Sequence, residues 1–488
     1  MIRNVVCAEI LAILVICAGV MSFGCPGPDG NGHASPVPGG GGILVAAHDS
    51  PAESKMVADY LCDGAGDQAE IQGALNALGS AGGTVTLADG TFHLSGNLNI
   101  PGNVVLEGQG PDATRLEWCS GFMQCRGVQD IVLRDFTTTG TGAIFIYNCD
   151  HVKVHNVTAT VDNSRWGGAF TLWVSSGVME DIEFANCRAV DCGRMGFMND
   201  GEGSPRLIRD IRYIDCEAVN SGRYSRFSPY GEWTTGFAIA ENNDLADTVL
   251  VGCVAEGSFE SGFHIEDAPE ITNLVFENCI SRYNGQKSDG FYNPSENTHG
   301  LHFGSGYWVH GGTTLYNCVS EGNGNAGFSV GPGTSLYNCT DDGSAVGFRL
   351  VDTRDAYLED CTSRNAGAYA VYALEAENVA TKNLQMIDPG GVNGNGAFFG
   401  TVAHPVVASR FDVVGRSGGD IHAIYGEGCR DIVFTGVIRA DHPEPVVIKR
   451  GAGVDTGGLE IRAGPENPGR SPVSVLKSLL LRIFTVFS

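Results

Sequence analysis

Positively charged residues are scarce in this chain of 488 residues. It has 30 lysines and arginines against 56 aspartates and glutamates, which gives a formal net charge of −26 at pH 7. Nucleic-acid-binding proteins need basic patches that neutralise phosphates, so the composition argues against a nucleic-acid partner. The same charge disfavours polyanionic polysaccharides, unless a local basic site or a cation intervenes.

Closely paired cysteines are also missing. None of the 16 cysteines forms a Cys-x-x-Cys motif, which disfavours a zinc or redox site of that type. Cys119 and Cys125 lie six residues apart and leave open a disulfide between them.

The chain has instead an internal repeat between Phe184 and Leu374. In four copies a cysteine is followed eight or nine residues later by Gly-Phe, and uninserted copies are 21 or 22 residues apart. Apolar residues alternate within a copy, as in Phe263-His264-Ile265, and a period of two indicates strands. Short strands with this period predict one rung of a coil that stacks on the next as parallel β-sheet.

The repeated cysteines are expected to form a row inside the coil, one per rung and roughly 4.8 Å apart. A free thiol is small and apolar enough for such a position. The row comprises Cys187, Cys216, Cys253, Cys279, Cys318, Cys339 and Cys361, continued by Phe136, Val157, Leu384 and Val437. Asn or Asp usually precedes the cysteine, which predicts a ladder of side-chain hydrogen bonds at this bend.

The first 42 residues predict export. Residues 1–24 have a basic start and an apolar stretch, typical of a signal peptide or a membrane anchor. Residues 25–42 are rich in Pro and Gly and predict a flexible tether. Lipidation of Cys25, as in a bacterial-type lipoprotein, is one alternative. Both alternatives place the protein outside the cell or on the envelope surface, with a membrane tether at its N-terminus in the second.

The segment from Asp59 to Gly110 carries a family resemblance. Apolar residues at helical spacing predict a helix over about 67–78, with Asp67 as its N-cap and Gly79 as its end. Gly-Gly-Thr-Val-Thr-Leu and Asn-Val-Val-Leu-Glu-Gly-Gln-Gly follow it.

This arrangement resembles the opening of pectate-lyase-like proteins, including their polygalacturonase-related and tailspike branches. The resemblance implies an all-β fold, a right-handed parallel β-helix over residues 43–462 with an N-terminal capping helix. The sequence lacks the Asn-Thr-Asp, Asp-Asp, Gly-His-Gly and Arg-Ile-Lys motifs of polygalacturonases and the Asp-Pro-His-Asp motif of alginate epimerases, so the resemblance assigns no catalytic residue.

Two copies of the repeat contain insertions. Cys216 and Cys279 are followed by their glycines, Gly236 and Gly300, only after 20 and 21 residues. The insertions, 221–235 and 286–299, occupy the same turn of the coil and should project from the same side. Long loops on a rigid scaffold usually carry function, although loops that only shield the coil are the alternative. Aromatic and charged side chains suited to sugars are expected to bind substrate here: Tyr224, Arg226, Tyr230, Trp233, Lys287 and Tyr292, with Arg349 nearby.

Outward strand positions between these insertions give the candidate catalytic group. Two residues after the repeat glycine stand Met198, Ala238, His264, His302, Ser329 and Arg349, which predicts that His264 and His302 stack on adjacent rungs. Glu266 follows at the strand end, in an acidic row with Asp200, Glu241 and Asp267. The catalytic candidates are therefore His264, His302 and Glu266.

Two reactions fit these residues. In a lyase or an epimerase, a base removes the proton beside a uronate carboxylate, and Ca²⁺ held by Asp200, Glu241 and Asp267 would neutralise that carboxylate. In a hydrolase, two carboxylates flank the glycosidic bond and no cofactor is required. The plain alternative is a row of exposed turn residues that cap backbone groups.

Residues 463–488 read as a linker and a short amphipathic helix, over 474–488. The sequence thus predicts an exported β-helix that binds polysaccharide and cleaves or modifies it. The alternative is a non-catalytic surface or adhesion protein.

Overall fold

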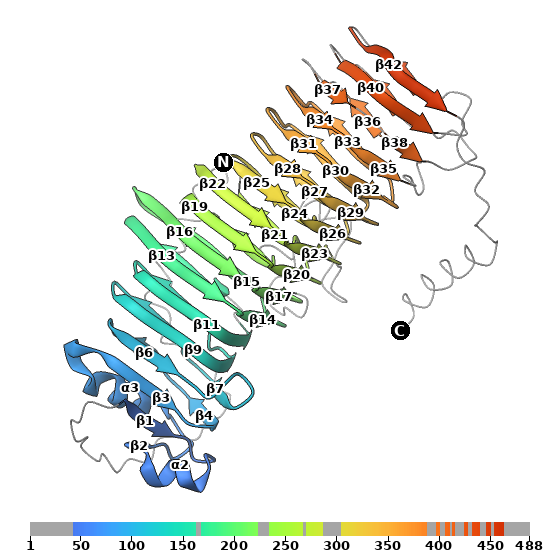
Figure 1. Ribbon diagram of the computed structural model, residues 1–488. Helices are drawn as coiled ribbons and strands as arrows, with labels where there is room; N and C mark the ends of the chain where they lie inside the picture. Colours follow the sequence, from blue (N-terminus) through green and yellow to red (C-terminus); the bar gives the residue numbers. More distant parts are fainter. Residues whose placement is uncertain are drawn as a thin grey trace, which may run out of the picture.

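Each turn of the chain contributes three short parallel strands. The structure, a computed structural model, describes residues 42–162, 167–222, 234–266, 270–285 and 304–387, together with further strands between 397 and 462 (Figure 1). One such turn consists of β19 (Asp244–Val251), β20 (Val254–Glu256) and β21 (Phe263–Ile265), and each strand pairs in parallel with its counterpart in the next turn. We call the three stacks the first, second and third face.

The first two faces form one continuous sheet, because β9 (Gln129–Gly140), β11 (Asp150–Val161), β40 (Ile432–Arg439) and β42 (Asp455–Arg462) are long enough to run along both. The first face also contains β3 (Gly83–Leu87), β6 (Val104–Glu107), β13 (Gly177–Ala185), β16 (Arg206–Ile214), β22 (Ile271–Glu277), β25 (Thr313–Tyr316), β28 (Ser335–Tyr337), β31 (Tyr357–Glu359), β34 (Ala380–Lys382) and β37 (Val406–Ser409). The second contains β4 (Gly90–Leu94), β7 (Thr114–Trp118), β14 (Arg188–Val190), β17 (Glu217–Val219), β23 (Ile280–Arg282), β26 (Val319–Glu321), β29 (Thr340–Asp342), β32 (Thr362–Arg364), β35 (Gln385–Ile387) and β38 (Asp412–Val414).

The third face is a separate sheet of 14 strands. Besides β21 it contains β5 (Leu98–Ile100), β8 (Met123–Arg126), β10 (Ile144–Tyr147), β12 (Gly168–Val174), β15 (Met195–Gly201), β18 (Phe237–Ile239), β24 (Tyr307–Val309), β27 (Ala326–Val330), β30 (Val346–Val351), β33 (Tyr369–Leu374), β36 (Ala397–Gly400), β39 (Ile424–Glu427) and β41 (Val446–Lys449). Figure 1 shows the strands stacked along one long axis. The chain folds as a right-handed parallel β-helix, as predicted.

The N-terminal part contains β1 (Ile43–Ala46), α2 (Ala52–Val57), β2 (Tyr60–Leu61), α3 (Gln68–Ala77) and the 3₁₀ turn η1 (Gly79–Ala81). The predicted helix is α3, which buries Ile71 and Leu75 in the core. Asp67 is not its side-chain cap, because its carboxylate accepts instead from the backbone N–H groups of Gly64 and His93. That α3 acts as the cap of the coil stays a prediction. Among the described residues, no helix is long and apolar enough to cross a membrane.

The cysteine row is confirmed. The seven predicted cysteines are all buried free thiols, and the register places them on successive rungs. Each thiol from Cys187 to Cys279 donates to a backbone carbonyl of the preceding rung, at 3.1–3.4 Å. Cys125 is also free, so it does not pair with Cys119. The side chain of Val437 lies outside the described residues.

The ladder beside the cysteines is also confirmed. Asn317 donates to Asn278 at 3.3 Å, and Asn338 donates to Asn317 at 2.8 Å. Most of these corner residues have the left-handed backbone conformation, with φ of 54° at Asn317 and 52° at Asn338. Asn and Asp tolerate this conformation better than other non-glycine residues, which explains their recurrence at the bend.

The Gly-Phe phrase of the repeat builds a second internal stack, of aromatic rings. The rings of Phe237, Phe263, Tyr307 and Phe328 lie nearly parallel, with centroids 4.8, 5.0 and 4.8 Å apart along the series. The preceding glycines are required because a Cβ at Gly262 would lie 2.1 Å from Ser281 Oγ.

A buried carboxyl group on the second face gives a testable pH dependence. Burial raises the pKa of Asp341 to about 8, against the opposing hydrogen bonds of Ser344 and Ser320. The native state therefore keeps a proton that the unfolded chain loses near pH 4, so this residue destabilises the fold as the pH rises from 4 to 8. We expect Asp341→Asn to remove this slope, and its stability relative to the parent to improve by roughly 1–3 kcal/mol between pH 5 and pH 8.

Urea unfolding of both proteins at the two pH values would measure this change. A difference in unfolding free energy that is the same at both pH values would show that Asp341 does not titrate as described.

Candidate functional site

The outer row of the third face passes through the predicted catalytic position. The register pairs Met198 with Ala238, and Ala238 with His264, as expected. His264 then pairs with Trp308, and the row continues through Ser329 to Arg349. All of these side chains alternate with the buried aromatic stack, so they point away from the core.

The predicted stack of His264 on His302 is wrong. Tyr307 continues the aromatic stack, so the repeat glycine of this rung is Gly306 and not Gly300. Trp308 thereby takes the position expected for His302, and its ring lies 6.1 Å from that of His264 at an angle of 14°. His302 itself lies outside the described residues.

His264 is held tightly in this row. It is only 4% exposed, and its Nε2 lies 3.2 Å from Oε1 of Glu266. A carboxylate bonded to one ring nitrogen fixes the orientation of the imidazole. Two of the three predicted catalytic residues are therefore in direct contact.

Glu241 joins them because of an unusual backbone. Ala240 follows β18 with φ of 58°, a left-handed conformation that is unfavourable for alanine. One ligand atom each of Glu241, His264 and Glu266 lies within 4.8 Å of the others. Glu241 was predicted as a metal ligand in the strand-end row, and the structure places it in the catalytic group instead. We call Glu241, His264 and Glu266 the Glu-His-Glu group.

The charges around Glu241 make it hard to ionise. Burial raises the pKa of its carboxyl group well above the usual range, and the charges of Glu266, Asp200 and Glu260 act in the same direction. Arg194 opposes them. A protonated Glu241 beside an ionised carboxylate is the pairing that general acid catalysis at a glycosidic bond requires.

Asp200 belongs to a neighbouring, separate arrangement. Its carboxylate accepts from Asn242 Nδ2 at 2.9 Å and from the Gly201 backbone at 2.7 Å. Burial nevertheless raises the pKa of Asp200 to about 6. The structure therefore does not gather Asp200 with Glu241 as a pair of calcium ligands. Asp267, the third predicted ligand, lies outside the described residues.

Arg349 stands farther along the same outer row. Its Nη1 donates to Ser329 Oγ at 3.3 Å, and its guanidinium carbon lies 5.6 Å from the centre of the Trp308 ring. Trp308 thus contacts His264 on one side and Arg349 on the other. The predicted role of Arg349 in substrate binding is consistent with this position but is not tested by it. The other predicted substrate-binding residues lie outside the described residues: Tyr224, Arg226, Tyr230, Trp233, Lys287 and Tyr292.

Sequence reasoning missed three residues near the group, Arg194, Glu260 and Trp308. Arg194 and Glu260 are buried, and each stands two residues before a repeat glycine, Gly196 and Gly262. Alignment of the positions before the glycine, in addition to those after it, could have found both. Trp308 could have been found from the need for a ring between Phe263 and Phe328.

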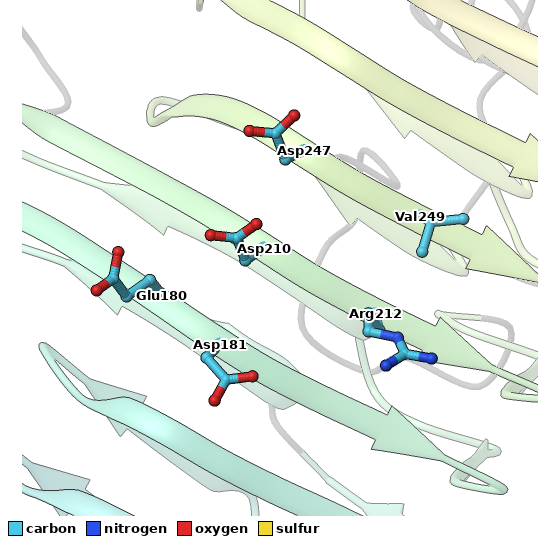
Figure 2. Close-up of a pocket in the computed structure, with 6 residues that line it drawn as sticks. All are labelled: Glu180, Asp181, Asp210, Arg212, Asp247 and Val249. Carbon is cyan, nitrogen blue, oxygen red and sulfur yellow. The ribbon is translucent and has the colours of Figure 1, made fainter.

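A hollow on the outer first face is a second polar feature. Figure 2 shows Asp181, Asp210 and Asp247 on three neighbouring strands, beside Glu180 and Arg212. The three aspartates have φ between 46° and 55°, so they occupy corner positions as the asparagines do. This explains their recurrence as a structural requirement of the bend, and we assign them no chemistry.

Comparisons with known proteins agree with the fold. No protein-family model matches the chain, and no curated protein sequence matches it. Among solved structures, the chain is similar to the mannuronan C-5 epimerase AlgE6 A-module of Azotobacter vinelandii, at 14% identity and a TM-score of 0.40, over 82% of this chain and 96% of that one.

It is also similar to the pectate lyase Pel9A (14% identity, TM-score 0.38, 71% of this chain and 79% of that one) and to the Dettilon tailspike protein (12%, 0.41, 78% and 64%). Identities this low show a shared architecture only. The strand pairing and these likenesses together describe a right-handed parallel β-helix of the kind found in pectate-lyase-like proteins.

Proposed function

We propose that the protein binds a polysaccharide along the outer third face and hydrolyses its glycosidic bonds at the Glu-His-Glu group. The observation that carries the proposal is the contrast between two adjacent carboxyl groups. Glu241 is buried among other acidic residues, whereas Glu266 is oriented by His264. One group is suited to be the acid and the other to be the ionised carboxylate.

The distance between the two carboxyl groups favours one stereochemical course. Their nearest ligand atoms lie within 4.8 Å, which is close to the separation of about 5–5.5 Å in retaining glycosidases and too short for a water between them. Glu241 would protonate the leaving oxygen, and Glu266 would attack the anomeric carbon. Water would then release the sugar from Glu266, with Glu241 acting as the base.

The charge of the site favours a neutral glycan over a uronate. Asp200, Glu241, Glu260 and Glu266 outnumber Arg194 around the group, so a uronate carboxylate would be repelled without a cation. Trp308 offers an aromatic ring of the kind on which sugars stack. Lyase and epimerase chemistry on uronates is therefore the second candidate.

A non-catalytic adhesion protein is the other alternative. It would be favoured by a histidine directed freely into solvent, and His264 is instead buried and bonded to Glu266. Export and an N-terminal tether remain part of the proposal, because residues 1–41 lie outside the described residues.

An activity screen tests the proposal directly. The full chain would be incubated with neutral and uronate-containing polysaccharides, with and without Ca²⁺, and new reducing or unsaturated ends would be measured. We expect reducing ends from a neutral glycan, with the anomeric configuration retained when the first products are followed by proton NMR. Inverted products would contradict the roles given to Glu241 and Glu266. Unsaturated ends would favour the lyase, and binding without turnover would favour the adhesion protein.

A further inference from the structure

The Glu-His-Glu group has the geometry of a small metal site. It offers one imidazole nitrogen and two carboxylate oxygens, from β21 and from the turns that follow β18 and β21. Ligands around tetrahedral Zn²⁺ lie about 3.3 Å apart, because metal–nitrogen and metal–oxygen distances are about 2.0–2.2 Å. His264 and Glu266 already have this separation, at 3.2 Å. Glu241 need only rotate its side chain to complete the set.

Glu241 supplies an independent observation. Its side chain is only 9% exposed, and among the described residues it has neither a hydrogen-bond partner nor an ion-pair partner. A buried polar group without a partner is costly, and in native proteins it commonly marks a missing water or ion. The vacant oxygen of Glu241 faces His264 and Glu266 rather than the core.

A second group of possible ligands in the chain lacks this feature. Cys62, Asp67 and Glu70 also come within 4.8 Å of one another. Both oxygens of Asp67, however, accept backbone hydrogen bonds from Gly64 and His93. Asp67 therefore has a structural role that needs no ion.

We propose that Glu241, His264 and Glu266 bind one divalent transition-metal ion of the Zn²⁺ type. Imidazole nitrogen suits zinc and its neighbours, whereas calcium takes six to eight oxygen ligands. The structure therefore favours zinc over the calcium expected from the sequence. If the proposed function is correct, on which this step rests, the ion occupies both catalytic carboxylates and inhibits hydrolysis.

Isothermal titration calorimetry of the metal-free full chain with zinc chloride tests the site. We expect zinc to bind, and one zinc per chain to be lost or weakened at least tenfold in Glu241→Gln, His264→Ala and Glu266→Gln. Asp200→Asn is the matched control, because it removes a buried neighbouring carboxylate outside the group, and it should keep that zinc. Calcium should bind at least tenfold more weakly than zinc.

Several results would overturn the site. They are the absence of zinc binding, equal binding by the parent and the three variants, or a preference for calcium that Asp200→Asn abolishes. Circular dichroism of each metal-free variant identifies any that fail to fold. Cobalt offers a second measurement, because the visible absorption of bound Co²⁺ should change in His264→Ala if that imidazole is a ligand.

Binding and activity separate this inference from the proposed function. Zinc bound at the three residues in a protein that hydrolyses no polysaccharide would support the metal site and contradict the proposed function. Hydrolysis that is lost in Glu241→Gln, in a protein that binds no zinc, would do the reverse. Zinc bound at the group without inhibition would support the ion and contradict its overlap with the catalytic carboxylates.

Discussion

Glu241→Gln is expected to lower the rate of glycosidic bond hydrolysis by about 10²–10⁴-fold, because glutamine cannot donate the proton that the leaving oxygen needs. The substitution keeps the size of the side chain and removes a buried acid that has no partner among the described residues, so the fold should tolerate it. The measurement is kcat on the most active polysaccharide from the screen. Since burial and three carboxylates raise the pKa of Glu241, the parent rate should fall as the pH rises through that pKa, and the variant should lose this limb.

Glu256→Gln is a matched control. Glu256 pairs with Arg282 on the second face, with Nη2–Oε2 at 2.7 Å, away from the third-face row. It should leave kcat unchanged. Retention of full activity by Glu241→Gln would exclude Glu241 as the acid and return attention to the lyase candidate.

Phe263→Ala is expected to destabilise the coil by about 3–5 kcal/mol, as large-to-small substitutions of buried aromatic residues usually do. Phe263 is completely buried and stacks between Phe237 and Tyr307 at 4.8 and 5.0 Å. Its ring also meets Phe276 edge-on at 5.4 Å. Removal of the ring leaves a cavity that the neighbouring rungs, fixed by their strand ladders, cannot close.

Urea or thermal unfolding would measure this loss. Tyr316→Ala is the control, because Tyr316 is also stacked on a neighbouring ring, that of Tyr337, but lies on the outside and is 41% exposed. It should cost under about 1 kcal/mol. Equal losses in the two variants would mean that the internal stack contributes nothing beyond ordinary ring contacts.

The internal architecture could be predicted because it repeats. Spacing alone placed the cysteine row, and the alternation around Phe263 gave the inward and outward residues correctly. Every rung obeys the same packing rule, so each copy corrects errors in the others. The left-handed corners were not predicted, although the recurrence of Asn and Asp was their signal.

The candidate site was harder to predict, because it departs from the repeat. Gly300-Leu-His and Gly306-Tyr-Trp both fit the spacing after Cys279, and only the need for a ring in the stack selects the second. The turn at Ala240, which brings Glu241 to His264, breaks the local preference for Asn, Asp or Gly at positive φ. No pattern in a single sequence identifies an alanine in that conformation.

The uninserted period of 21 residues between Cys318 and Cys339 has a consequence for how this protein can change. Each rung touches chiefly its two neighbours, so the coil resembles a one-dimensional crystal in which every unit cell presents the same contacts above and below. Excision of a whole cell, from Val319 to Cys339, would join Cys318 to Thr340 and leave every column continuous. Length is therefore a nearly free variable of this molecule, and it can be adjusted without disturbing the catalytic face several rungs away.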